Sequence, residues 1–187
     1  NAIGGAYVAD RLTRALAGQD VDVTFVLPKR FPVSVPYARI IPAEFEEAGM
    51  KVRYVDSDVI PYAVKGSYAI APDGTMLYGD DLLGQTRRYA RAGAAIARSE
   101  PHDVIYAHDW LSFGAGRAAK HVSGKPLIAH LHASEFARTG GRGVNQDVYD
   151  IERAGMHEAE RVIAVSHRTK EAITEHYGVP ADKIRVV

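Results

Sequence analysis

The stretch Val104–Leu111, which reads VIYAHDWL, decides the fold of this chain. Its first four residues form an apolar run, as expected of a strand that is covered on both faces. His108, Asp109 and Trp110 follow directly and lie at the carboxyl end of that strand. Ligands of open α/β sheets bind in the crevice beyond the carboxyl ends of the strands, so these residues indicate a functional site.

A second stretch of the same design follows further along the chain. The apolar residues Leu127–Ala129 run into the polar sequence HLHASE at residues 130–135. The carboxyl ends of neighbouring parallel strands meet at one edge of a sheet. We therefore expect the polar side chains of both stretches to face one cleft.

Predicted strands and helices alternate along most of the chain, while residues 29–50 are mixed and give no clear element. The predicted strands lie at about 21–27, 52–55, 104–107, 127–131, 161–165 and 183–187. The predicted helices lie at about 6–17, 82–98, 113–122, 146–158 and 167–177, with a hairpin at 62–78. This alternation of apolar strands with helices predicts an α/β fold with a doubly wound, mostly parallel Rossmann-like sheet.

Composition narrows the class of protein. The 187 residues suffice for one domain, which we expect to span residues 1–187. Lys plus Arg number 23 and Asp plus Glu also 23, and this balance disfavours general binding to nucleic acid. No apolar run approaches the roughly 20 residues of a membrane-spanning helix. The chain has no cysteine, which excludes disulfides and fits a cytoplasmic location.

The pair Gly4–Gly5 opens the first predicted helix. Two glycines at that place let a phosphate approach the backbone amides and the positive end of the helix dipole. The alternative is a simple tight turn, because the GxGxxG pattern of dinucleotide folds and a Walker lysine are both missing.

His108 is the first candidate for catalysis. An imidazole at a strand end can bond a sugar hydroxyl or phosphate, or carry a proton near neutral pH, although it can also simply end the strand. Asp109 either orients His108 or caps the helix that follows. Trp110 is expected to anchor the loop by packing.

His130 and His132 lie two residues apart, so they share one face of a strand. We expect no metal there, because no third ligand follows at a suitable spacing. His132 and Glu135 are better interpreted as polar contacts to a substrate, and the alternative for Glu135 is a solvated loop acid.

Three more polar residues follow the predicted strands. Arg138 and Arg142 flank a glycine-rich loop and either meet anionic groups or are solvated. Ser166 follows the strand at 161–165, where it either caps the next helix or touches a ligand. No GxSxG pattern occurs in the sequence, which argues against a serine hydrolase.

In their order along the chain, these stretches resemble the amino-terminal domain of retaining GT-B glycosyltransferases, in particular the glycogen and starch synthases and their family-four relatives. The matching stretches are Gly4–Ala9 with Leu12–Leu16, Asp103–Trp110 with the family's HDW signature, His132–Glu135, and Glu152 with Glu158–Ser166. The resemblance covers nearly the whole chain. It implies one half of a GT-B architecture, in which two Rossmann-like domains face a cleft.

The resemblance also implies a function. This function is the transfer of a sugar from a nucleotide diphosphosugar to a glycan or other acceptor, with retention of the anomeric configuration. The expected sugar is glucose. His108 would contact the donor sugar, with Asp109 beside it as a second catalytic candidate. The implied substrate-binding residues are Gly4, Gly5, Tyr7, His132, Glu135, Arg138 and Ser166. A helix N-terminus and basic groups can stabilise the departing diphosphate without a metal, so the nucleotide sugar is a co-substrate and no cofactor is expected.

The family's carboxyl-terminal domain, which grips most of the nucleotide sugar, and the strand before Gly4 have no counterpart in the sequence. We therefore expect a fragment whose partner is its own carboxyl-terminal domain and which is inactive alone. Two alternatives stay open. They are a sugar-nucleotide epimerase of the same fold and a non-catalytic Rossmann-like binding module.

Overall fold

The computed structural model describes residues 12, 15–16, 19–27, 39–42, 69–70, 76–77 and 82–187. The chain divides into two compact units, residues 1–88 and 89–187. In the first unit, strand β1 (Thr24–Leu27) pairs in parallel with β2 (Arg39–Pro42). Strands β3 (Ala69–Ile70) and β4 (Met76–Leu77) pair antiparallel, as predicted for a hairpin there.

The sequence prediction missed β2, because Pro42 and two further prolines interrupt its surroundings and hide the apolar run. Leu12, Ala15 and Leu16 are helical, in agreement with the predicted first helix. The predicted strand at 52–55 lies outside the described residues, and so do Gly4, Gly5 and Tyr7.

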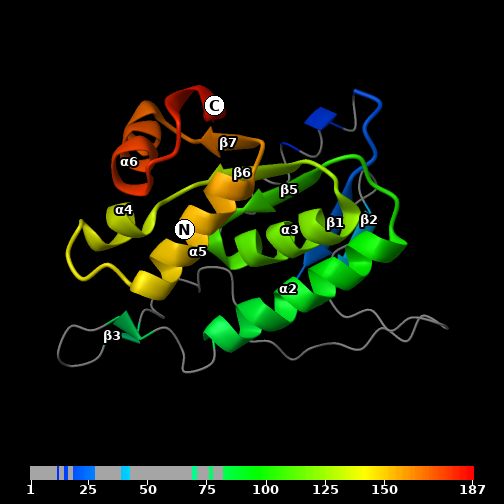
Figure 1. Ribbon diagram of the computed structural model, residues 1–187, viewed down its shortest axis with the longest axis horizontal. Helices are drawn as coiled ribbons and strands as arrows, with labels where there is room; N and C mark the ends of the chain where they lie inside the picture. The colour runs from blue at the N-terminus through cyan, green and yellow to red at the C-terminus, as the bar shows by residue number, and fades with distance from the viewer. Residues whose placement is uncertain are drawn as a thin grey trace. The chain divides into compact units, whose positions relative to one another are not determined.

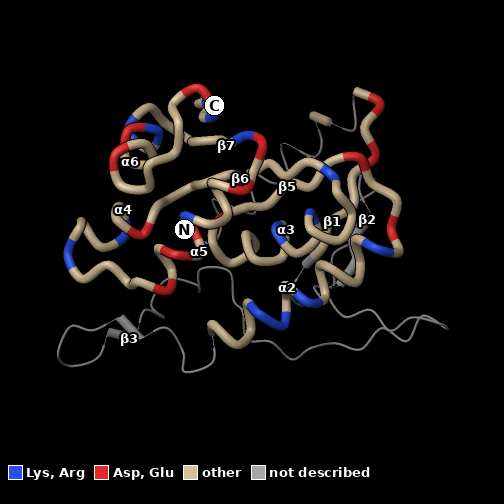
Figure 2. Tube along the Cα trace, viewed as in Figure 1, with Lys and Arg blue, Asp and Glu red and all other residues tan. Residues whose placement is uncertain are grey.

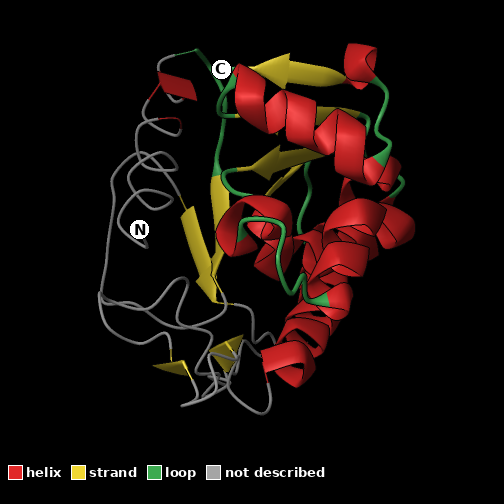
Figure 3. Cartoon of the chain, turned by 90° about the vertical axis from the view of Figure 1, so that its left-hand side faces the viewer, coloured by secondary structure: helices red, strands yellow, loops and turns green. Residues whose placement is uncertain are grey.

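The second unit contains a parallel sheet of four strands in the order β5–β6–β7–β8 (Figure 1). These strands are β5 (Ile105–His108), β6 (Leu127–Leu131), β7 (Arg161–Ala164) and β8 (Ile184–Val186). Helix α2 (Leu82–Ser99) runs across the boundary between the two units. The helices within the second unit are α3 (Asp109–Ser123), α4 (Glu135–Thr139), α5 (Gln146–Glu158) and α6 (His167–Tyr177), with a 3-10 turn η1 (Ala181–Lys183). Figure 3 shows the helices of the second unit packed alongside its parallel strands. The predicted Rossmann-like α/β fold is confirmed.

The core of this unit lies between the sheet and its helices. Helix α3 packs on β5 and β6 and against α5, and α6 packs on β7 and β8. Close packing of α3 depends on Gly116, because a Cβ there would lie 2.8 Å from Leu127 Cδ1 and 3.0 Å from Ala107 Cβ. Trp110 is only 2% exposed, which confirms its predicted packing role. The remaining core side chains include Phe113, Leu131, Met156, Val162, Ile173 and Ile184.

Gly155 is where α5 meets the ring of Phe113, which is fully buried. A Cβ at Gly155 would lie 2.6 Å from Phe113 Cδ2, so Gly155→Ala is expected to lower the free energy of unfolding by about 1–3 kcal/mol through overpacking. Urea denaturation measures this change. Gly114→Ala is the matched control, because its Cβ would meet only Ala90 Cβ at 3.7 Å and alanine favours a helix. Equal denaturation midpoints for Gly155→Ala and the unmodified protein would contradict the packing argument.

Helix α3 begins at Asp109, four residues before the predicted start. The backbone of Asp109 is left-handed, with φ 57°, and it turns the chain from β5 into the helix without a loop. Helix α4 was also missed, since five residues carry no helical periodicity. Its N-cap is Ser134, whose hydroxyl accepts a hydrogen bond from the N–H of Ala137 at 3.2 Å.

Candidate functional site

Three imidazoles meet at the carboxyl ends of β5 and β6. The parallel register places His108 opposite His130, and His132 follows the end of β6. The rings of His130 and His132 are stacked, with centroids 4.2 Å apart. His108 Nδ1 and His132 Nε2 lie 3.1 Å apart and share a hydrogen bond. The predicted convergence of the two strand ends is thereby confirmed for these side chains.

His130 is the buried member of this imidazole cluster (His108, His130 and His132), with 2% of its surface exposed. Its Nδ1 shares a hydrogen bond of 3.1 Å with the Tyr106 hydroxyl, while its Nε2 is buried without a hydrogen-bond partner. The sequence argument against a metal found no third ligand near His130 and His132. That argument is wrong on this point, because the register between β5 and β6 places His108 of the neighbouring strand beside His130 as a possible third ligand.

Burial keeps two of these imidazoles neutral. Desolvation, and then repulsion from His132, lowers the pKa of His108 to about 4. Desolvation, followed by repulsion from His132 and His108, lowers the pKa of His130 to about 3. A neutral imidazole has one donor and one acceptor nitrogen, so at pH 7 each ring can both give and take a hydrogen bond.

Acidification is expected to destabilise this fold. Histidines of the unfolded chain take up protons near pH 6.5, whereas His108 and His130 in the folded state do so near pH 4 and 3. The unfolded state therefore binds more protons below pH 6.5. The two histidines contribute their full share of the free energy of unfolding above about pH 6.5. As the pH falls from 6.5 toward 4, this share decreases by up to about 1.4 kcal/mol per pH unit for each histidine.

Chemical denaturation at pH 7, 6 and 5 measures this slope. His130→Gln is the control, since it removes one of the two titrating groups and should make the slope shallower. A slope that is the same in both proteins would contradict the neutral state of His130.

Asp109 takes neither of the two roles considered from the sequence. The N-cap residue of α3 is His108, and no side-chain cap bond is made there. Instead, Asp109 is 7% exposed and its Oδ1 accepts a hydrogen bond of 2.7 Å from the backbone N–H of His132. Burial raises the pKa of Asp109, and the His132 N–H and the Arg138 charge oppose this rise. Asp109 thus ties the start of α3 to the segment that carries His132.

A buried charge network lies directly after the imidazole cluster. Glu135 and Glu152 are both fully buried. Arg138 Nη2 donates to Glu135 Oε2 at 3.0 Å and to Glu152 Oε1 at 2.6 Å. The other oxygens are also used, because Glu135 Oε1 accepts from the Asn145 N–H at 3.1 Å and Glu152 Oε2 accepts from the Tyr177 hydroxyl. Burial raises the pKa of Glu152, and the charge of Arg138 opposes this rise.

This network corrects one part of the sequence interpretation. Glu135 is not a solvated loop acid, and the Arg138 side chain is only 9% exposed. The Glu135 N–H also donates to Glu152 Oε2 at 3.0 Å, which fastens the segment after β6 to α5. The network therefore holds the backbone on which His132 stands. Substrate contact by Glu135 and Arg138 stays a prediction.

Ser166 and Arg142 are the remaining candidate residues that the structure describes. Ser166 Oγ accepts a hydrogen bond of 3.1 Å from the Thr169 N–H, so its predicted role as N-cap of α6 is confirmed. Arg142 is exposed on the loop between α4 and α5. Sequence reasoning missed Glu152 and Tyr177 as members of a site, because nothing local marks a helix acid or a terminal tyrosine as partners of Arg138.

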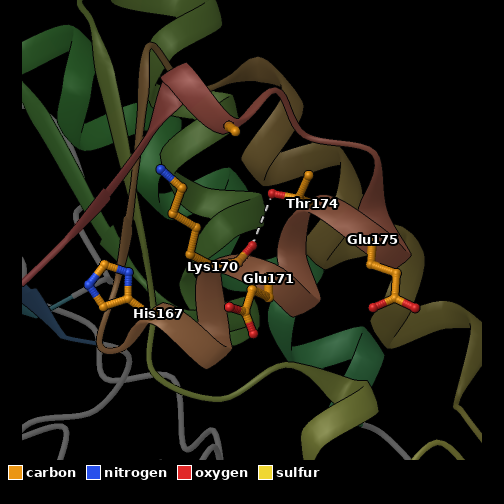
Figure 4. A pocket seen from close by; sticks show the side chains of 6 residues that line it. His167, Lys170, Glu171, Thr174 and Glu175 are labelled. Carbon is orange, nitrogen blue, oxygen red and sulfur yellow. Dashed lines mark hydrogen bonds between the residues drawn. The ribbon is translucent and has the colours of Figure 1, made fainter.

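A separate pocket lies along the outer side of α6 (Figure 4). The residues that line it are His167, Lys170, Glu171, Thr174, Glu175 and Ala181. The Thr174 hydroxyl donates to the Lys170 carbonyl at 3.0 Å. None of the site residues predicted from the sequence lines this pocket.

Charges of both signs are interspersed along the described trace (Figure 2). This pattern agrees with the balanced composition of the sequence. Within residues 82–187 and the shorter described segments, the structure has no helix that is long and apolar enough to cross a bilayer.

Comparison with known proteins gives a consistent set of relatives. The family model described as Glycosyltransferase Family 4 matches residues 3–187. The chain is 26% identical over 143 residues to glycogen synthase of Mycobacterium tuberculosis, which covers 70% of this chain and 34% of the relative. It is 32% identical over 106 residues to D-inositol 3-phosphate glycosyltransferase of Acidothermus cellulolyticus, which covers 50% of this chain and 23% of the relative.

The structural comparison concerns the fold alone. Sucrose-phosphate synthase from Thermosynechococcus elongatus superposes with a TM-score of 0.65 at 15% sequence identity. The match covers 97% of this chain and 41% of that protein. The chain thus matches less than half of the length of each of these proteins.

Proposed function

Because the chain belongs to glycosyltransferase family 4 and its Rossmann-like fold is one half of a GT-B architecture, we propose that it is the acceptor-side domain of a retaining glycosyltransferase. The reaction moves a sugar from a nucleotide diphosphosugar to a glycan or other acceptor, and glucose is the sugar that we propose. The observation that carries this proposal is the meeting of His108 and His132 from two parallel strands, with ring nitrogens 3.1 Å apart.

His108 is the residue that contacts the donor sugar. Its Nδ1 is bonded to His132, which leaves Nε2 for a sugar hydroxyl. A neutral imidazole suits this role, because it bonds a hydroxyl without placing a positive charge beside an oxocarbenium-like centre. His132 and Glu135 belong to the acceptor side, and Asp109 positions His132 through its backbone N–H.

The departing diphosphate needs compensation of its charge. As the family resemblance implies, backbone amides of Gly4 and Gly5 supply part of it and Tyr7 is a further substrate-binding residue, although all three lie outside the described residues. Basic groups of a carboxyl-terminal domain supply the rest, so the reaction uses no cofactor and this chain alone is inactive. Closure of the two domains excludes water, which competes with the acceptor as nucleophile.

Two relatives suggest the class of acceptor. Glycogen synthase supports glucose and an α-glucan, whereas the inositol phosphate enzyme supports a small phosphorylated acceptor. The glycan takes preference, because the glycogen synthase match covers more of this chain.

The absence of cysteine supports a cytoplasmic location.

The experiment is an assay of the full-length protein with a panel of nucleotide diphosphosugars, each with and without glycan or inositol phosphate acceptors. We expect free nucleoside diphosphate only when an acceptor is present, and a product with the donor's anomeric configuration. Interconversion of nucleotide sugars without an acceptor would instead indicate an epimerase. Binding without any turnover would indicate a non-catalytic module, and either result would overturn the proposal.

A further inference from the structure

We propose that the imidazole cluster is a binding site for a transition-metal ion of the zinc type. One ring nitrogen from each of His108, His130 and His132 lies within 4.8 Å of the others. Zinc sites with three imidazoles keep a fourth position open for water or another ligand. With Zn–N bonds of about 2.0–2.1 Å, ligand nitrogens in a tetrahedral site lie roughly 3.3 Å apart. The 3.1 Å between His108 Nδ1 and His132 Nε2 already meets this spacing.

His130 gives the second, independent observation. Its Nε2 is buried without a hydrogen-bond partner, although buried polar atoms in proteins are nearly always bonded. A metal ion at the cluster would satisfy this atom. The other ring nitrogen, Nδ1, can donate to the Tyr106 hydroxyl at 3.1 Å, which is how metal-binding histidines are usually oriented.

The protein also fixes the position of one of these ligands. The third ligand is held in place through its backbone, since Asp109 accepts the His132 N–H at 2.7 Å.

An ion bound through His108 Nδ1 would leave Nε2 facing the donor sugar but would place a positive charge beside the oxocarbenium-like centre. Zn²⁺ is therefore an inhibitor of transfer rather than its cofactor. This last step rests on the proposed function, whereas the binding of the ion does not.

The test is calorimetric titration of the metal-free, full-length protein with Zn²⁺ at pH 7. We expect one ion bound at the cluster, and an affinity reduced by more than about 100-fold in His130→Gln and in His108→Gln, which exceeds the usual loss for an outer-shell partner. His167→Ala is the matched control, because His167 is exposed and lies outside the cluster, and it should bind Zn²⁺ as the unmodified protein does. Circular dichroism checks that each variant is folded.

The outcomes separate the two proposals. Loss of binding in a folded cluster variant, with binding kept in His167→Ala, supports the metal site. Equal Zn²⁺ affinity in the unmodified protein and both cluster variants overturns it. Zinc binding at the cluster without any effect on measurable sugar transfer leaves the metal site supported and overturns the inhibition and the role of His108 at the donor.

Discussion

Arg138→Met is expected to lower the free energy of unfolding by about 3–5 kcal/mol, the cost of breaking a buried ion pair from one side. Arg138 is the cation that bonds both Glu135 and Glu152, and both carboxylates are fully buried. Methionine keeps much of the apolar stem of the side chain, but it leaves the two buried carboxylates without their cation. Urea denaturation at pH 7 gives the loss.

Two further variants test this explanation. Arg142→Met removes an exposed arginine of the neighbouring loop and should change stability by less than about 0.5 kcal/mol. Adding Glu135→Gln and Glu152→Gln to Arg138→Met should recover part of the loss, because the unpaired charges are then gone. If Arg138→Met and Arg142→Met are equally stable, the buried network does not hold the segment after β6 in place.

Asp109→Ala is expected to cost about 2–4 kcal/mol of stability, from two causes. Alanine at φ 57° costs roughly 1–2 kcal/mol in the left-handed region. Loss of the carboxylate also removes the acceptor of the His132 N–H, which costs about 1–3 kcal/mol for a donor left unpaired. Relief of the buried charge offsets a part of both. Thermal and urea denaturation measure the net change.

The comparison with Asp109→Asn isolates these causes. Asparagine keeps an acceptor oxygen and tolerates the left-handed conformation, so this variant should be the most stable of the series. Asp109→Gly, which relieves the backbone but lacks the acceptor, should fall between the two. An alanine variant as stable as the asparagine variant would show that Asp109 does not fasten His132.

Elements with a strong local signal were predictable from the sequence. The bounds of β6 and α5 agree with the predicted 127–131 and 146–158, because one is a short apolar strand and the other is an amphipathic helix that begins after the N-cap Asn145. Helix α4 escaped prediction because five residues are too few to show a helical period, and strand β2 escaped it because prolines interrupt its surroundings.

The candidate site was predictable in position but not in detail. Strand ends place His108 and His132 at one edge, and this follows from sequence alone. The pairing of His108 with His130 depends on the register between β5 and β6, which no local pattern encodes. The burial of Glu135 likewise depends on Glu152, which approaches it only when α5 packs on the sheet.

The central claim is that the imidazole of His108 acts on the donor sugar, and His108→Ala in the full-length protein tests it most directly. With a circular dichroism spectrum matched to the unmodified protein, turnover should fall by at least about tenfold, equivalent to about 1.4 kcal/mol of lost transition-state stabilisation. His167→Ala, measured in parallel, should keep the original rate. An unaltered rate in a folded His108→Ala protein would contradict the account.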